Sequence, residues 1–158
     1  MRSIKSCTDA ALLAALNEEV QQKHHRMHPG IFKPYDREGI EAEISRYLSQ
    51  DGAMAFIAWD DQLPAGYLIA LERHTRESAY KYASDSLYID QISVLSSHRG
   101  QGIAKALLAY VLDICREKRI GRIELDHWSA NEEARRFFSK AGFTYCKETM
   151  FLDLWHRI

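Results

Sequence analysis

The sequence predicts a single α/β domain, built on a mixed sheet with helices on both faces. Three observations lead to this fold class. The chain has 158 residues, the size of one domain. Apolar runs of strand length alternate with stretches of helical periodicity. No internal repeat or Pro/Gly/Ser-rich linker divides the chain, so we expect one domain over residues 1–158, with the order β-α-α-β-β-β-α-β-α-β-β.

The amino-terminal third predicts one short strand and two helices. Residues 2–5 have the length of a short strand. Thr8 and Asp9 are typical of a helix start, and the apolar residues after them recur at helical spacing. A second helix is expected from about Asp36, and Gly52 is placed to close it.

The middle of the chain predicts three strands. Residues 53–59 and 65–72 are apolar runs separated by a polar turn, which is typical of a hairpin. The polar stretch 73–85 is expected to be a loop or the tip of an extended hairpin. Residues 87–94 form the third strand.

The remainder predicts two further helices among short strands. The stretch 103–118 is apolar nearly all round, so we expect a helix buried on more than one side. A strand at 123–128 is followed by a capping box of Ser129 and Glu132, which predicts a helix that Gly142 ends. Short strands at 143–147 and 149–154 complete the prediction.

Composition excludes several classes of protein. The 21 Lys and Arg residues nearly balance the 22 Asp and Glu residues, which argues against a protein that neutralises many phosphates of a nucleic acid. No apolar run approaches the ~18 residues of a membrane span, and no signal peptide is evident. Three scattered cysteines form no CxxC pair, so neither a disulfide framework nor a zinc ribbon is expected. We therefore expect a cytoplasmic protein with no metal, nucleic-acid or membrane partner.

A glycine-rich turn, Gly100-Gln101-Gly102, lies between a predicted strand and a long predicted helix. Such a turn can direct main-chain N–H groups at one ligand, and the start of the helix adds partial positive charge, so phosphate groups bind well there. The segment matches neither GxxxxGK[ST] nor GxGxxG. Taken alone, it is equally typical of a plain strand-to-helix turn.

Two motifs resemble those of the GNAT superfamily of N-acetyltransferases. Arg99-x-x-Gly102-x-Ala104 resembles the loop that binds the pyrophosphate of acetyl-coenzyme A (acetyl-CoA) in that family. Residues 123–143 resemble its second signature, a strand, an Asn-led helix and a closing Gly-Phe. Together the two motifs span residues 87–143.

The resemblance implies the GNAT fold, with acetyl-CoA bound as co-substrate between two splayed parallel strands, here 87–94 and 123–128. The main chain of Ile92, Ser93 and Val94 would pair with the pantetheine arm as an added strand. The pyrophosphate contacts are assigned to Arg99, Gly100, Gln101, Gly102, Ile103, Ala104 and Lys105. The far end of the cofactor is assigned to Asn131, Ala134 and Phe138.

The implied reaction is direct transfer of the acetyl group to a primary amine in a ternary complex. The amine must lose a proton before it attacks, and Asp90 lies where some relatives that acetylate polyamines carry a Glu proposed as base. Asp90 could instead pair across the sheet or bind the ammonium of the acceptor. Alternation along the strand predicts that Tyr88, Asp90, Ile92 and Val94 share one face, and an N–H near Val94 would stabilise the oxyanion.

Phe138 departs from the family pattern, because relatives often carry at this position a Tyr that protonates the departing thiolate. Three explanations stay open: the thiolate leaves unassisted, another group such as Tyr145, Tyr88 or water replaces the Tyr, or the protein binds acyl-CoA without turnover, as a sensor would. The sequence does not distinguish among small amines, amino acids, drugs and peptide termini as the acceptor. The oligomeric state also stays open, and homodimers are common in such folds.

Overall fold

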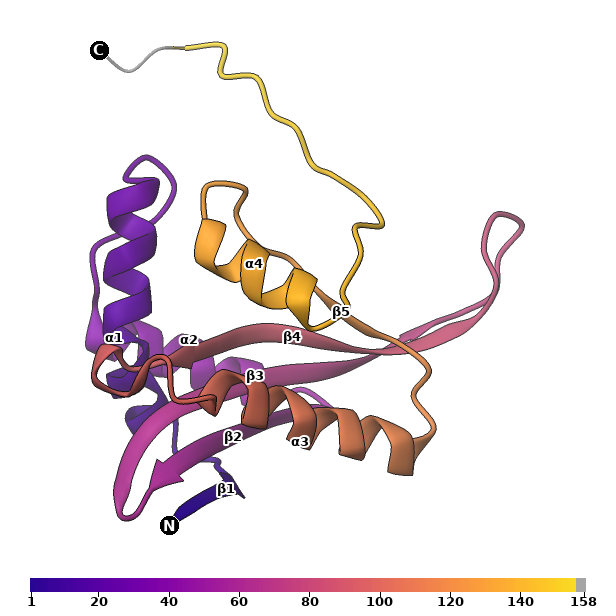
Figure 1. Ribbon diagram of the computed structural model, residues 1–158. Helices are drawn as coiled ribbons and strands as arrows, with labels where there is room; N and C mark the ends of the chain where they lie inside the picture. The colour runs from indigo at the N-terminus through magenta and orange to yellow at the C-terminus, as the bar shows by residue number, and fades with distance from the viewer. Residues whose placement is uncertain (156–158) are drawn as a thin grey trace. The chain divides into compact units, whose positions relative to one another are not determined.

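The computed structural model describes residues 1–155, and these form an α/β structure (Figure 1). The elements in chain order are β1 Arg2–Ser6, α1 Ala10–Met27, α2 Arg37–Leu48, β2 Ala53–Asp60, β3 Leu63–Thr75, β4 Ser84–Val94, a short 3₁₀ turn Ser96–His98, α3 Ile103–Lys118, β5 Ile123–Leu125 and α4 Glu132–Lys140. The chain divides into two compact units, Met1–Asp126 and a second that begins at His127. A single domain over the whole chain therefore stays a prediction.

Both amino-terminal helices begin where the sequence predicts, for a local reason. The Asp9 carboxylate accepts a hydrogen bond from the Leu12 N–H at 3.0 Å, and Asp36 accepts one from Gly39 at 3.2 Å. Each satisfies an N–H that the first turn of a helix leaves without a partner. Gly52, by contrast, does not close α2; the helix already ends at Leu48, and Gly52 adopts a φ of +81° in the turn that leads into β2.

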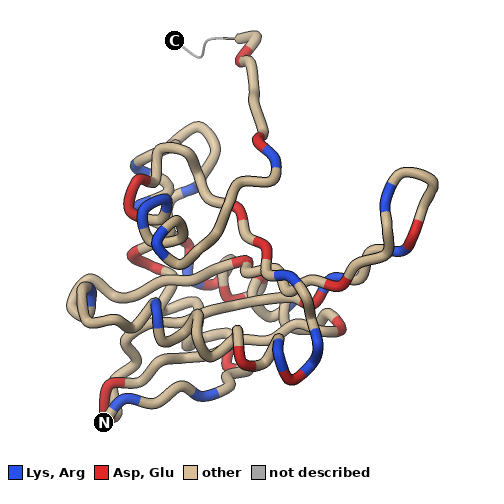
Figure 2. The backbone as a smooth tube through the Cα atoms, turned by 45° about the vertical axis from the view of Figure 1, so that its right-hand side comes forward, with Lys and Arg blue, Asp and Glu red and all other residues tan. Residues whose placement is uncertain are grey.

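The sheet of the first unit has the order β1-β2-β3-β4-β5. Its first four strands are antiparallel and β5 lies parallel to β4, so the sheet is mixed, as predicted. The β3–β4 hairpin extends beyond the other strands (Figure 1). Of the two alternatives for residues 73–85, the tip of an extended hairpin is confirmed. Figure 2 shows basic and acidic residues close together along this extension.

The two faces of this sheet carry different helices. Ala55 and Ile57 of β2 pack with Leu13 of α1 and Ile44 of α2 in one apolar cluster. Their neighbour Phe56 points to the opposite face, where its ring meets Tyr110 of α3 at 5.1 Å between centroids. Alternation along β2 thus separates the α1–α2 side from the α3 side, and helices cover both faces.

Two predictions for the α3–β5 region are wrong. The buried residues of α3 form a single stripe, and Leu112 is exposed, so the helix is not buried on more than one side. The strand predicted at 123–128 is only three residues long, because its pairing with β4 ends at Leu125.

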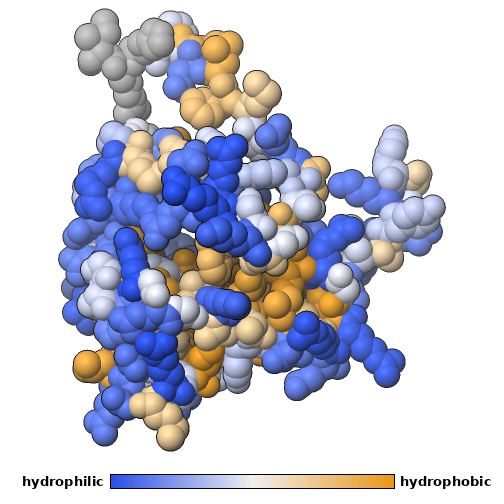
Figure 3. All heavy atoms as spheres, viewed as in Figure 1, coloured by the Kyte–Doolittle hydropathy of each residue, from blue (hydrophilic) through white to orange (hydrophobic). Residues whose placement is uncertain are grey.

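The second unit contains α4 but neither of the two predicted terminal strands. Asn131, not Ser129, caps α4, since its side-chain oxygen accepts the Ala134 N–H at 3.2 Å. Gly142 follows the helix with a φ of +94°, as expected of its terminator. Residues 143–147 and 149–154 adopt no strand, because a strand persists only when its main chain pairs with a neighbour. Figure 3 shows apolar side chains at the surface of this final stretch. Phe151 and Leu152, for example, are 73% and 83% exposed.

No helix within residues 1–155 is long and apolar enough to span a membrane.

Candidate active site

A β-bulge in β4 displaces Asp90. Ile69 of β3 pairs with Gln91 and the next residue, Ala70, pairs with Ile89, so Asp90 has no partner across the ladder. The extra residue breaks the alternation of side chains. Ile92, which pairs with Leu68, therefore lies on the α3 side, whereas Tyr88 lies on the α1–α2 side. The predicted common face for Tyr88 and Ile92 is wrong for this reason.

Asp90 is exposed to solvent, and the phenol groups of Tyr47, Tyr67 and Tyr88 lie near enough to interact electrostatically with its carboxylate. Loss of hydration raises its pKa above the ordinary value of an aspartate, while a hydrogen bond from Gln91 and the positive charge of Arg73 act in the opposite direction. A carboxylate with a raised pKa is a stronger base, as proton abstraction requires.

Tyr88, two residues before Asp90, contacts one charged group on β3 and another just after β5. Its hydroxyl donates to the carboxylate of Asp126, just after β5, at 2.8 Å. The Arg73 guanidinium lies 3.5 Å from the centre of its ring, in a cation–π contact. Burial, followed by the hydrogen bond to Asp126, raises the pKa of Tyr88 to about 12. The phenol is therefore protonated at neutral pH and directed at Asp126.

The parallel strands β4 and β5 pair over only three positions, from Leu87 to Ile89. Beyond the bulge, the segment of β4 that holds Ile92, Ser93 and Val94 pairs with β3 but not with β5. The two strands predicted to splay thus part at Asp90. An unpaired strand edge is available to an extended ligand that presents amide groups.

The glycine-rich turn leaves its amides free. Among residues 1–155, no group accepts a hydrogen bond from the main-chain N–H groups of residues 100–105. Gly100 and Gly102 have φ values of +72° and +79°, and a Cβ built on either meets no atom within 4 Å. The amide of Arg99 is engaged with Ser96, so Arg99 would contribute through its side chain, whose Nε donates to the Val94 carbonyl at 3.4 Å.

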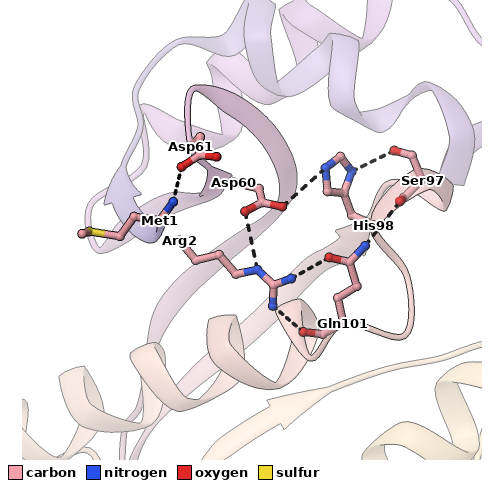
Figure 4. A network of polar contacts seen from close by, with 7 residues as sticks. All are labelled: Met1, Arg2, Asp60, Asp61, Ser97, His98 and Gln101. Carbon is pink, nitrogen blue, oxygen red and sulfur yellow. Dashed lines mark hydrogen bonds and ion pairs between the residues drawn. The ribbon is translucent and has the colours of Figure 1, made fainter.

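A polar network from the first strand holds this turn (Figure 4). Arg2 donates from Nη1 to the Gln101 carbonyl oxygen at 2.6 Å and from Nη2 to the side-chain oxygen of Gln101 at 2.5 Å. Asp60 lies 3.7 Å from Arg2 Nε and 4.0 Å from the His98 ring. Arg2 of β1 and Asp60 of β2, both from the part of the sheet nearest the β1 edge, thereby hold the loop predicted to bind the pyrophosphate.

Three predicted cofactor residues belong to the second unit. Asn131 and Ala134 form the helix cap already described. Phe138 is buried against the rings of Phe137 and Phe143, at centroid distances of 5.0 and 5.4 Å. A phenyl ring carries no acidic proton. Tyr145, named as a substitute acid, pairs its hydroxyl with His127 Nε2 at 3.2 Å.

No cluster of three or more His, Cys, Asp or Glu side chains within residues 1–155 is arranged to hold a metal ion.

The family model described as "Acetyltransferase (GNAT) family" matches residues 15–143, which is most of the chain. The chain belongs to the GNAT acetyltransferase family. The fold class and the family predicted from the two motifs are thereby confirmed.

Two known acetyltransferases are similar to parts of the chain. Streptothricin acetyltransferase of Streptomyces lavendulae is 31% identical over 68 residues, which are 43% of this chain and 36% of that protein. Human N-acetyltransferase 8B is 30% identical over 112 residues, which are 71% of this chain and 47% of that protein. The chain thus spans less than half the length of either relative.

A solved structure shows the same fold over nearly the whole chain. A tetramutant of the BH1408 protein from Bacillus halodurans superimposes with a TM-score of 0.90 at 21% identity, and the match covers 96% of this chain and 99% of that one.

The turn before α3 fits the pyrophosphate of acetyl-CoA, which GNAT acetyltransferases use. Its amides have no hydrogen-bond partner among residues 1–155, and the space beside the Cα atoms of Gly100 and Gly102 is open. Both glycines have a positive φ, which strains the main chain of any residue that carries a Cβ.

Several residues of the site escape sequence reasoning. Arg2, Arg73 and Asp126 carry no local signal, because each acquires its role through a contact made by folding. Two others left a trace. Asn17 interrupts the apolar stripe of α1, and Gln91 directly follows Asp90 in the otherwise largely apolar run of residues 87–94.

Proposed function

We propose that this protein is an acetyl-CoA-dependent N-acetyltransferase that acetylates a primary amine by direct attack in a ternary complex. The observation that carries the proposal is the set of unpartnered amides over residues 100–105, next to a β4 edge that β5 leaves unpaired. Membership of the GNAT acetyltransferase family supports transfer of an acetyl group as the reaction.

We assign the pyrophosphate to the amides of Gly100, Gln101, Gly102, Ile103, Ala104 and Lys105, and to the side chain of Arg99. The main chain of Ile92, Ser93 and Val94 would hold the pantetheine arm, and Asn131, Ala134 and Phe138 the far end of the molecule. Bound acetyl-CoA supplies the acetyl group as a thioester. A main-chain N–H near Val94 is the donor that we assign to the thioester oxygen.

Asp90 is the residue that we assign as base. An ammonium has no free electron pair, so it must lose a proton before it attacks. In this step an N–H bond of the acceptor breaks, an O–H bond forms on the Asp90 carboxylate, and the electron pair stays on nitrogen. The raised pKa of Asp90 favours this transfer.

No side chain is assigned as acid for the departing thiolate. Tyr88 and Tyr145 both remain candidates, although each hydroxyl is engaged elsewhere in its own unit. A thiol with a pKa of ~8.5 is also an adequate leaving group without assistance.

The acceptor is proposed only as an amine. The relative from Streptomyces lavendulae is named a streptothricin acetyltransferase, which supports transfer to an amine acceptor. The near balance of charges in the chain favours no strongly charged partner.

The test is release of coenzyme A from acetyl-CoA across a panel of primary amines, together with calorimetry of coenzyme A binding. Binding with turnover on one or more amines is the expected result. Binding without turnover on any amine would favour the sensor function that the absent tyrosine at position 138 allows, and no binding at all would contradict both.

A further inference from the structure

We propose that Asn17, Tyr67 and Gln91 form a positioning network that orients the Asp90 carboxylate for proton transfer. The proposal rests on the function proposed above, in which Asp90 is the base. The network joins α1, β3 and β4, which approach one another on the α1–α2 side of the sheet.

Four hydrogen bonds define the network. The Gln91 side-chain N–H donates to Asp90 Oδ2 at 3.4 Å. Its carbonyl oxygen accepts from the Tyr67 hydroxyl at 2.9 Å and from Asn17 Nδ2 at 3.1 Å. The same Asn17 nitrogen donates to the Tyr67 oxygen at 3.0 Å.

These contacts determine which way the Gln91 amide faces. The Asp90 carboxylate can only accept hydrogen bonds, so the end of the Gln91 amide that faces it is the NH₂ group. The other end is the oxygen, which accepts from Tyr67 and Asn17. A donor in this position stabilises the deprotonated carboxylate, the form that a base needs before it receives a proton.

Two members of the network, Asn17 and Tyr67, are buried. Asn17 is 7% exposed and Tyr67 is 1% exposed. Buried polar groups cost stability unless they are fully hydrogen-bonded, and Asn17 Oδ1 has no hydrogen-bond partner among the described residues. A leucine at position 17 would continue the apolar stripe of Leu13 and Leu16. Fold stability alone therefore does not account for an asparagine at position 17.

The bulge explains why Asp90 needs such support. Asp90 is the extra residue of the bulge, so pairing with β3 does not hold its main chain in place, and a side-chain contact can help to orient its carboxylate. The titratable and charged groups that face it are Arg73 and Tyr67 from β3, Tyr88 from β4 and Tyr47 from α2. Of these, only Arg73 is charged at neutral pH, and Gln91 is the hydrogen-bond donor to Asp90.

The test compares Gln91→Leu and Tyr67→Phe with Tyr110→Phe, which removes a hydroxyl from α3 on the opposite face. In Gln91→Leu we expect kcat to fall about tenfold, while KM for acetyl-CoA changes by less than about twofold. The acid limb of the pH–rate profile moves to higher pH, because the carboxylate loses a donor. Tyr67→Phe gives a smaller change in the same direction, and Tyr110→Phe gives none.

Two further measurements separate positioning from structure. Carbon-13 NMR titration of Asp90 reports its pKa without any substrate, and the pKa should rise in Gln91→Leu. In an Asp90→Asn background, Gln91→Leu should cause little further loss of kcat, because the group that it orients is gone.

The proposal is overturned if the pKa of Asp90 is unchanged in both Gln91→Leu and Tyr67→Phe. It is also overturned if the losses of kcat in Gln91→Leu and Asp90→Asn are fully additive. A wild-type protein that binds acetyl-CoA but acetylates no amine contradicts the proposed function instead, and the NMR titration then still decides whether the network acts on Asp90.

Discussion

The guanidinium of Arg2 donates a hydrogen bond to the main-chain carbonyl oxygen of Gln101 at 2.6 Å, so a residue at the start of the first strand holds the turn that precedes α3 (Figure 4). A second bond reaches the side-chain oxygen of Gln101. With the carbonyl held by Arg2, the amides of the turn remain available to an anionic ligand.

Replacing Arg2 with alanine should weaken coenzyme A binding about fivefold, since a charge-assisted hydrogen bond stabilises by about 1 kcal/mol or more. The turnover number should change little, because Arg2 lies among the loop contacts and not at Asp90. Isothermal calorimetry measures the affinity. Arg46→Ala, which breaks an exposed pair with Glu43 on α2, is the control. Equal affinity in the two variants would contradict the role of Arg2.

Replacing Gly102 with valine should weaken coenzyme A binding more than about tenfold while the fold survives. The φ of +79° strains any residue with a Cβ by about 1–2 kcal/mol, and the new side chain enters the space assigned to the pyrophosphate. Gly121→Val is the matched control, because that glycine has open space and no positive φ. Calorimetry beside a thermal melt separates binding from folding. Unchanged affinity would remove the loop assignment.

Replacing Asp90 with asparagine should lower kcat chiefly at neutral pH, with partial recovery at high pH where the amine is already deprotonated. The wild-type rate should rise with pH through the raised pKa of Asp90. Asp85→Asn, a change at an exposed position of the same strand, is the control. A pH–rate profile identical to that of the wild type would exclude Asp90 from the mechanism.

The same Asp90→Asn variant should be more stable than the wild type at pH 7. A raised pKa means that the folded state binds the proton more tightly than the unfolded state, so the free energy of unfolding falls as pH rises through that pKa. Asparagine removes this loss, and the advantage should shrink toward the ordinary aspartate pKa of ~3.9. Urea unfolding at pH 7 and at pH ~4.5 measures both. A variant less stable than the wild type at pH 7 would contradict the raised pKa.

Replacing Gly66 with alanine should destabilise the first unit by roughly 1–3 kcal/mol. A Cβ at this position would lie 2.7 Å from the Ser93 carbonyl oxygen and 3.2 Å from the Val94 Cα, both in the main chain of β4. Gly30→Ala, in open space, is the control. Denaturant titration measures the difference, and equal midpoints would show that the strands can separate without cost.

Much of the fold follows from local rules. Asp9 and Asp36 begin helices because a carboxylate satisfies N–H groups three residues further on, within the same short segment. The same rules fail at residues 143–147 and 149–154, where apolar character predicts strands but the main chain pairs with no neighbour. Strand propensity is local, whereas strand formation requires an edge supplied by another part of the chain.

The candidate site divides in the same way. Asp90 and the glycine-rich turn are visible in the sequence because their types and spacing carry the chemistry. Gln91 and Asn17 are 74 positions apart, and only packing of α1 against the sheet brings them within 3.1 Å. The bulge escapes any alternation rule, since it depends on the register between β3 and β4.

The sequence by itself determined the family, the order of the main helices and strands, and the turn assigned to a phosphate ester, because periodicity, capping and glycine content act within a few residues. Only the tertiary structure decided where β4 and β5 part, how Arg2 reaches Gln101 and which side chains are hydrogen-bonded in the network next to Asp90. These depend on strand register and on contacts between distant segments, which no local pattern encodes.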